Sequence, residues 1–428
     1  LREPQTDKNL EKPDENLEST LARLCASQEY HIVQGPPGTG KTSGLLKEYI
    51  ARQYRDSDDR ILILSFTNRA VDEICGCLKK AEIPYIRTGN SQDVDEELLS
   101  NIIHGKSYRQ IDEALRGNRI WVATVSSCAG WLPDMLRLVS FDQLIIDEAS
   151  QIVENSILGI VSKVKKTILI GDQNQLPPIT AMSGHGFRFS HPRLKELCYG
   201  HYSQSLLERL TRVCMRNGWQ HTNSLLRHHY RMHEEIAALI QHYYQDRLIS
   251  SLPKQKENLP PHGNALLASR VIWIDCPRTT TPYYDTFQVK LLCHLLDLFQ
   301  KEAIIQDYST DIGIVAPYRA MIHAIFQELK EEQKAITVDT VERFQGSERK
   351  NMILTLPIHD NSALSSLMSL SPDGSVDRKL NVALSRAQER VLILGNREMC
   401  LGSQHFAFLL DKIQAAGNLI PAKQIMPE

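Results

Sequence analysis

A glycine-rich segment near the start of the chain combines residue types that together can bind phosphate. It fits the pattern G-x-x-x-x-G-K-[ST], and its residues are Gly35, Pro36, Pro37, Gly38, Thr39, Gly40, Lys41 and Thr42. Glycines in such a loop let successive backbone N–H groups face phosphate oxygens at the positive end of a helix. Lys41 would add a mobile positive charge, and the Thr42 hydroxyl would be a ligand for Mg²⁺. The segment therefore predicts a site for a nucleoside triphosphate and Mg²⁺.

Two adjacent carboxylates, Asp147 and Glu148, directly follow the apolar run Leu144–Ile146. Open α/β sheets bind their ligands at the carboxyl ends of strands. We therefore expect Asp147 to hold Mg²⁺ and Glu148 to orient and deprotonate an attacking water. The next apolar run leads into the polar segment 171–178, where the Gln175 amide is expected to lie near the γ-phosphate.

The elements that must position these residues alternate along the chain. Apolar runs of strand length are followed by apolar residues at helical spacing, and this alternation predicts parallel sheets covered by helices on both faces. The expected strands are Tyr30–Gln34, Ile61–Phe66, Ile120–Val125, Leu144–Ile146, Thr167–Ile170, Val271–Asp275, Ile312–Tyr318, Ile336–Val341, Met352–Leu356 and Val391–Gly395.

The alternation occurs twice, but the second half has no phosphate loop of its own. We therefore expect two domains, residues 1–201 and 202–428, that hold one nucleotide between them. Residues 89–118 are more polar and predict a mostly helical insertion in the first domain. The segment Asn361–Asp377 is rich in serine and predicts a long loop.

The composition narrows the possible classes of protein. With 428 residues, 42% hydrophobic and 23% charged, the chain is typical of a globular protein of two or three domains. Its net charge of −2 gives no overall signal for nucleic acid. Nine scattered cysteines without a CxxC pair predict neither zinc nor a disulfide framework, and they favour a reducing intracellular compartment, cytoplasm or nucleus. We expect no membrane segment and no signal peptide, and the start at Leu1 fits a fragment of a longer protein.

The motifs, taken in order, resemble those of the superfamily-one helicases, most closely the branch that contains the nonsense-mediated-decay RNA helicase and the replication nuclease-helicase. The resemblance extends from about Tyr30 to Gly395. Besides the phosphate loop it rests on DEASQ (147–151), GDQNQLPP (171–178), HYRMH (229–233), APYR (316–319), VDT (338–340) with FQG (344–346), and LNVALSRA (380–387).

This resemblance implies two RecA-like domains, ATP as the nucleotide, and roles for further residues. Arg231 and Arg386 would be arginine fingers from the second domain, and Gln175 would sense the γ-phosphate. Tyr230 would stack on adenine, the Gly346 backbone would approach the phosphates, and Glu348 would reach the ribose. An arginine that reaches the γ-phosphate in the transition state can contribute about 10³–10⁵ in rate.

The same resemblance implies that a single strand of DNA or RNA crosses both domains. Hydroxyls, amides and backbone N–H groups suit phosphate contacts that do not depend on sequence. The residues expected to make them are Thr67, Asn68, Thr124, Ser126, Pro317, Tyr318, Arg319 and Thr340. The family comparison also implies 5′-to-3′ movement, a monomeric motor core, and a nuclease or other accessory domain that is fused or recruited.

The chain departs from the family in two respects. Residues 16–20 (NLEST) lack the adenine-reading glutamine of an N-x-x-Q pattern, and only a short lead-in precedes the phosphate loop, where this branch tends to carry a small β-barrel domain. Two alternatives to a helicase remain open. A nucleic-acid-dependent ATPase could clamp or remodel protein–nucleic-acid complexes without unwinding. A loader or remodelling ATPase of the AAA+ class could share GPPGTGKT, although it would not need YRMH, APYR or LNVALSRA.

Overall fold

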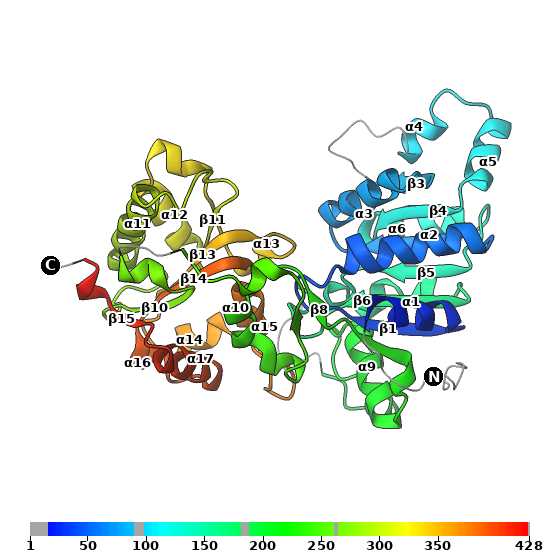
Figure 1. Ribbon diagram of the computed structural model, residues 1–428. Helices are drawn as coiled ribbons and strands as arrows, with labels where there is room; N and C mark the ends of the chain where they lie inside the picture. Colours follow the sequence, from blue (N-terminus) through cyan, green and yellow to red (C-terminus); the bar gives the residue numbers. More distant parts are fainter. Residues whose placement is uncertain (1–15, 90–97, 181–187, 261–263, 427–428) are drawn as a thin grey trace. The chain divides into compact units, whose positions relative to one another are not determined.

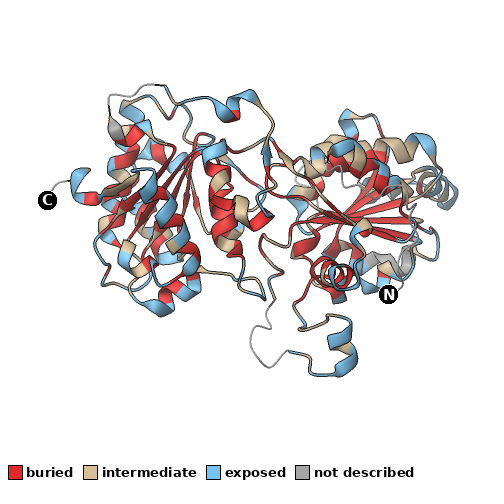
Figure 2. Cartoon of the chain, turned by 60° about the horizontal axis from the view of Figure 1, so that its bottom comes forward, coloured by how far each residue is buried: buried red, intermediate tan, exposed pale blue. Residues whose placement is uncertain are grey.

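The computed structural model describes residues 16–89, 98–180, 188–260 and 264–426. The chain forms two compact units. One comprises Leu1–Gln173 and Pro177–Arg227, and the other comprises Asn174–Leu176 and His228–Glu428. In both units the central strands of the sheet are among the most deeply buried elements (Figure 2).

The first unit is built on a seven-stranded sheet in the order β3-β4-β2-β5-β6-β1-β7, and all its strand pairs are parallel (Figure 1). The strands are β1 (Tyr30–Gln34), β2 (Ile61–Ser65), β3 (Tyr85–Thr88), β4 (Ile120–Thr124), β5 (Gln143–Ile146), β6 (Lys166–Gly171) and β7 (Asn223–Leu225).

Neighbouring side chains of these strands enter two separate cores, as the period of two in a strand requires. Leu62 packs with the helices α6 (Val125–Met135), α7 (Leu158–Val161) and α9 (Leu206–Asn217). Ile63 packs with α1 (Leu17–Ala26), α2 (Lys47–Asp56) and α3 (Asn68–Lys80). The sheet is therefore covered on both faces.

The second unit contains a six-stranded sheet in the order β12-β11-β13-β14-β10-β15, again with parallel pairs. Its strands are β10 (Val271–Asp275), β11 (Ile312–Val315), β12 (Thr337–Asp339), β13 (Arg349–Leu356), β14 (Ala387–Gly395) and β15 (Leu419–Pro421). One face packs on α11 (Thr286–Lys301) and α12 (Arg319–Glu328). The other packs on α10 (Glu234–Ile240), α14 (Asn361–Leu367), α15 (Arg378–Leu384) and α17 (Gln404–Ala415).

These two parallel sheets with helices on both faces confirm the predicted α/β fold class. Between β3 and β4 the chain forms α4 (Leu99–Ile103) and α5 (Tyr108–Gly117), so the described part of the expected insertion is mainly helical. Residues 90–97 of that insertion lie outside the described residues. No helix in the described ranges is both long enough and apolar enough to cross a membrane.

The division between the two units differs from the predicted one at residues 201 and 202. It falls after Arg227, because α9 buries Leu207 and Leu210 against the first sheet and β7 pairs with β1.

The predicted loop Asn361–Asp377 is also wrong in part. Its first half is the helix α14, capped by the Asp360 carboxylate, which accepts a hydrogen bond from Ala363 N at 2.7 Å.

Candidate functional site

The predicted phosphate loop connects β1 to a wide first helical turn, Lys41–Leu46, in which Leu45 N donates to Gly40 O five residues earlier. Gly40 has φ +73°, a conformation that glycine adopts without strain. At Gly35 a Cβ would lie 2.3 Å from Lys41 Cγ. Only glycine at position 35 therefore lets the Lys41 side chain lie back across the loop, where its Nζ donates to Gly35 O at 2.8 Å.

Asp147 and Glu148 follow β5 at the same edge of the sheet, since β5 pairs with β6 and β6 pairs with β1. Thr42 Oγ1 donates to Asp147 Oδ2 at 2.9 Å. Lys41 Nζ lies 4.0 Å from Glu148 Oε1. The structure thus brings together Lys41, Thr42 and both carboxylates, as their places in the sequence predict.

The two carboxylates have different surroundings. Asp147 is buried, and burial together with the neighbouring Glu148 charge raises the pKa of its carboxyl group above the ordinary value. Glu148 has φ +53°, which is unusual for a residue other than glycine. Its side chain is 23% exposed, and Oε2 accepts a hydrogen bond from Gln151 Nε2 at 3.2 Å. Backbone strain of this kind gathers at functional positions, and the partly exposed Glu148 carboxylate lies beside the lysine of the phosphate loop.

Gln175 belongs to the second compact unit, together with its neighbours Asn174 and Leu176. It is buried, and its Oε1 accepts a hydrogen bond from Arg386 Nη2 at 3.5 Å. Arg386 is buried as well, and its Nε donates to Val382 O at 3.1 Å. The predicted sensor and one predicted arginine finger therefore contact each other.

The second predicted finger, Arg231, pairs with Glu348, whose other oxygen accepts from Gln388 Nε2 at 2.7 Å. Burial alone would raise the pKa of Glu348, but the charge and hydrogen bond of Arg231 outweigh it and hold the pKa below its usual value. Tyr230, the predicted stacking residue, is 46% exposed, and Gly346 has φ +80°.

The predicted nucleic-acid residues form one group in each unit. In the first, Thr67 and Asn68 follow β2, Thr124 ends its neighbour β4, and Ser126 lies in the first turn of α6 after it. Thr67 Oγ1 accepts from Ala70 N at 3.2 Å, and Thr124 Oγ1 accepts from Ser127 N at 3.1 Å. These two hydroxyls therefore already cap turns. Thr67, Asn68 and Ser126 are exposed, and Thr124 is buried.

In the second unit Pro317, Tyr318 and Arg319 follow β11, and Thr340 follows the neighbouring strand β12. Arg319 is exposed, while the other three are half-buried. Thr340 N donates to Asp339 Oδ1 at 2.8 Å. The structure therefore places these four residues at one edge of the second sheet.

Two residues that support the predicted ones are not among the predicted site residues. Gln388 fixes the Glu348 carboxylate, as described above. Asn381 Nδ2 donates to Asn174 O at 2.7 Å and to the Tyr244 hydroxyl at 2.8 Å. Asn381 is part of LNVALSRA and Gln388 directly follows that motif, so a place in or beside the motif is the only sign of them in the sequence.

Comparison with known proteins shows matches over most of the chain. One family model, described as an AAA domain, matches residues 202–398. A second model with the same description matches residues 12–111 and 95–183. The DNA replication ATP-dependent helicase/nuclease DNA2 of Xenopus laevis is 30% identical over 92% of this chain and 38% of its own length. The human protein of that name is 26% identical over 91% of this chain and 37% of its own length.

Solved structures show weaker likeness. A Saccharomyces cerevisiae Dbp5 structure bound to RNA and ADP BeF3 matches with a TM-score of 0.48 and 9% identity, covering 97% of this chain and 92% of that one. An arterivirus nonstructural protein 10 (helicase) complex with DNA gives a TM-score of 0.42 and 14% identity, covering 85% and 60%. Likeness at this level adds nothing to the assignment.

The chain spans well under half of the length of the curated relatives described here. The matched regions contain every motif on which the resemblance rests, from the phosphate loop to LNVALSRA. On the strength of the two family models and the helicase relatives, the chain belongs to the superfamily-one helicases.

Proposed function

We propose that this chain hydrolyses ATP to move 5′-to-3′ along single-stranded DNA or RNA, and that this movement unwinds duplexes. The observation that carries the proposal is the group formed by Lys41, Thr42, Asp147 and Glu148 at one edge of the first sheet. Phosphoryl transfer to water needs a phosphate loop with carboxylates beside it, and here one carboxylate is buried and the other is partly exposed. Membership in the helicase family supports the coupling of that reaction to nucleic acid.

Each residue has a proposed task. Lys41 binds the β- and γ-phosphates, and Glu148 takes the proton of the attacking water. Gln175 orients the γ-phosphate, and Arg231 and Arg386 neutralise the charge that develops on it. In addition, Tyr230 stacks on the base of ATP, Glu348 reaches the ribose and the Gly346 backbone approaches the phosphates.

The residues beside the loop also suit Mg²⁺. Thr42 Oγ1 and Asp147 Oδ2 are hard oxygen donors 2.9 Å apart, which is the ligand type that this ion prefers. Thr42 and Asp147 would hold it, and a bound Mg²⁺ would offset the negative charge of the phosphates.

The partners are part of the proposal. The curated relatives are named as helicase/nucleases, and this chain covers 38% of the Xenopus protein. We infer that a nuclease or another accessory domain is joined to this motor or recruited by it, and that the motor itself acts as a monomer in a reducing compartment.

The test is steady-state ATPase activity without polynucleotide and with single-stranded DNA, single-stranded RNA or duplex. We expect strong stimulation by a single strand and its loss in Arg386→Ala. A strand-displacement assay on a tailed duplex then separates unwinding from clamping, because a clamp would hydrolyse ATP without displacing a strand. Hydrolysis that ignores every polynucleotide would overturn the proposal.

A further inference from the structure

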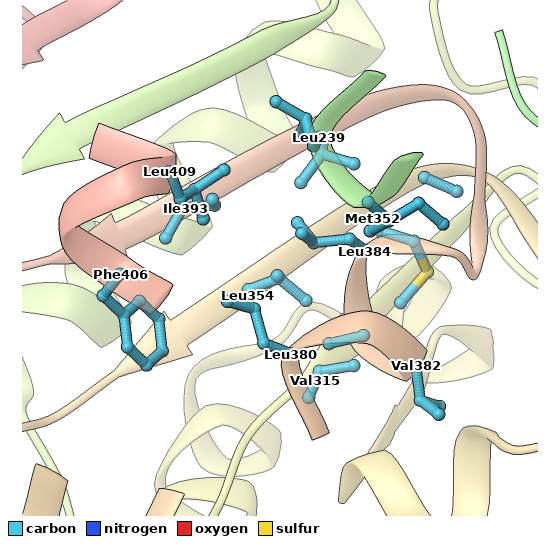
Figure 3. Packing of buried hydrophobic residues seen from close by; sticks show 14 of the residues in the cluster. Leu239, Val315, Met352, Leu354, Leu380, Val382, Leu384, Ile393, Phe406 and Leu409 are labelled. Carbon is cyan, nitrogen blue, oxygen red and sulfur yellow. The ribbon is translucent and has the colours of Figure 1, made fainter. Parts of the chain in front are cut away.

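The second unit contains a cavity of about 290 Å³, lined in part by Pro317 and Tyr318, whose apolar interior has no predicted role. It lies where β11 and β13 end, beneath α15 and α17. Its walls are apolar and come from Val315, Leu354, Leu380, Ile393 and Phe406. Figure 3 shows Val315, Leu354 and Leu380 grouped beside one another in this core. The carboxyl ends of parallel strands are the usual place for a ligand, and this volume is near the lower limit of about 300 Å³ for ligand pockets.

The mouth of this cavity is polar but nearly neutral. The Tyr318 hydroxyl lies 2.8 Å from Ser366 Oγ, and Lys379 Nζ donates to Ser366 O at 3.3 Å. Lys379 also pairs with Glu342 at 3.2 Å, so its charge is balanced. An apolar interior with hydroxyl groups at its mouth suits an aromatic ring that carries polar groups at its edge. It does not suit a phosphate group, which would require an excess of positive charge.

The surface around the mouth indicates whether such a ring belongs to a nucleic acid or to a protein segment. Ser362, Ser365 and Ser366 of α14 are exposed, and Arg319 is exposed next to Tyr318. Hydroxyls and an arginine are phosphate-binding groups. The centre of a protein–protein interface would instead be apolar and depleted of charge. The surroundings of the cavity therefore favour a nucleic-acid backbone over an apolar protein segment.

We propose that this cavity binds one base of a single strand whose phosphates contact Arg319 and Ser362 of α14. The half-buried Tyr318 ring lines the mouth and would stack on that base, and Tyr283 packs edge-on against it with ring centroids 5.3 Å apart. Stacking of this kind accepts any base, because every base has an aromatic face. The inference rests on the proposed function, since it requires that a single strand follows the edge of the second sheet.

The test uses two substitutions on one exposed helix. Ser366 lines the mouth of the cavity, whereas Ser365 does not. Ser366→Trp should close the mouth, and Ser365→Trp places the same bulk one residue away. We expect basal ATPase activity without nucleic acid to be unchanged in both. Fluorescence anisotropy should show that Ser366→Trp binds oligothymidylate about tenfold more weakly than Ser365→Trp and the wild type, which is the effect of losing one stacked base.

Two further probes separate base binding from general damage. An oligomer with the same backbone but abasic positions should bind the wild type and both variants equally. An oligomer containing 2-aminopurine should change its fluorescence on binding to the wild type and Ser365→Trp, and less so with Ser366→Trp. Two results would overturn the proposed base pocket and leave the motor function standing. One is equal affinity of the two variants for oligothymidylate, and the other is equal affinity of the wild type for oligothymidylate and the abasic oligomer. A wild type that binds neither oligomer would overturn the proposed function as well.

Discussion

At the scale of single residues, the neighbouring carboxylates of Asp147 and Glu148 differ because their surroundings differ. Asp147 is buried and accepts from Thr42, whereas Glu148 is partly exposed and lies 4.0 Å from Lys41 Nζ. The positive φ of Glu148 has a conformational cost, which the fold sustains. We interpret this as the separation of a metal ligand from a general base within two consecutive residues.

This separation predicts different losses in two variants. Glu148→Gln should lower kcat by about 10²–10⁴ while ATP still binds, because only the proton acceptor is removed. Lys41→Ala should weaken ATP binding and also abolish turnover, since the charge that faces the phosphates is gone. Equilibrium binding of a fluorescent ATP analogue and steady-state ATPase assays measure the two effects. Near-normal hydrolysis by Glu148→Gln would refute the assigned role.

A buried histidine makes stability depend on pH. His31 is fully buried in β1 with its Nε2 2.9 Å from Ser224 Oγ, and burial, helped by the charges of Arg23 and Lys166, lowers its pKa to about 3. In the unfolded chain the pKa is about 6.5, so the unfolded state binds the proton first and stability falls as the pH drops below that value. Between about pH 7 and pH 5 the loss from this group should be about 2 kcal/mol.

Urea denaturation at both pH values checks this expectation. His31→Gln cannot bind the proton, so its stability should change less with pH than that of the wild type. The other titrating groups are common to both proteins and cancel in the comparison. Parallel pH dependence in the two proteins would show that His31 does not contribute.

At the scale of elements, α9 shows how burial assigns a segment to a domain. Leu207 is 0% exposed within the core of the first unit, whereas Met215 on the same helix is 65% exposed. Leu207→Ala should therefore lower the free energy of unfolding by about 2–5 kcal/mol. Met215→Ala should change it by less than about 0.5 kcal/mol. Chemical denaturation followed by circular dichroism measures both, and equal effects would contradict the packing of α9 on the first sheet.

The elements that could be predicted from the sequence are the central strands. The runs Tyr30–Gln34 and Val271–Asp275 match β1 and β10, because a strand buried on both faces is apolar at successive positions. The strands β3, β7 and β15 were not predicted. All three are short strands at sheet edges, and Arg87, Asn223 and Pro421 interrupt or end their apolar runs.

Contacts between distant residues can be predicted only where the fold class brings the residues together. The loop Gly35–Thr42 and the carboxylates Asp147 and Glu148 could be placed together because strand ends of a parallel sheet share an edge. The ion pair of Arg231 with Glu348 joins positions 117 residues apart, and neither residue signals the other in the sequence. The cavity beside Tyr318 likewise depends on how α14 and α15 pack, and the serine-rich sequence of α14 suggested only a loop.

At the scale of the whole molecule, the balance of charge limits how nucleic acid can be held. The chain has 49 lysines and arginines against 51 aspartates and glutamates, so its overall field does not attract a polyanion. Binding must come from local contacts such as those proposed for Arg319 and the hydroxyls near it. Local contacts with phosphates still release counterions, and affinity still depends on salt.

We therefore predict that affinity for a single strand falls steeply as salt rises, with a logarithmic slope of about −0.7 for each phosphate neutralised. Arg319→Ala should make the slope shallower by about 0.7, the value for one lost contact. Arg109→Ala is the matched control, because its side chain is 89% exposed on α5 and no nucleic-acid contact is proposed for it. Anisotropy titrations over a range of salt concentrations give all three slopes. A flat titration in the wild type would argue against phosphate contacts altogether, whereas equal slopes for the wild type and Arg319→Ala would place the strand away from the β11 edge.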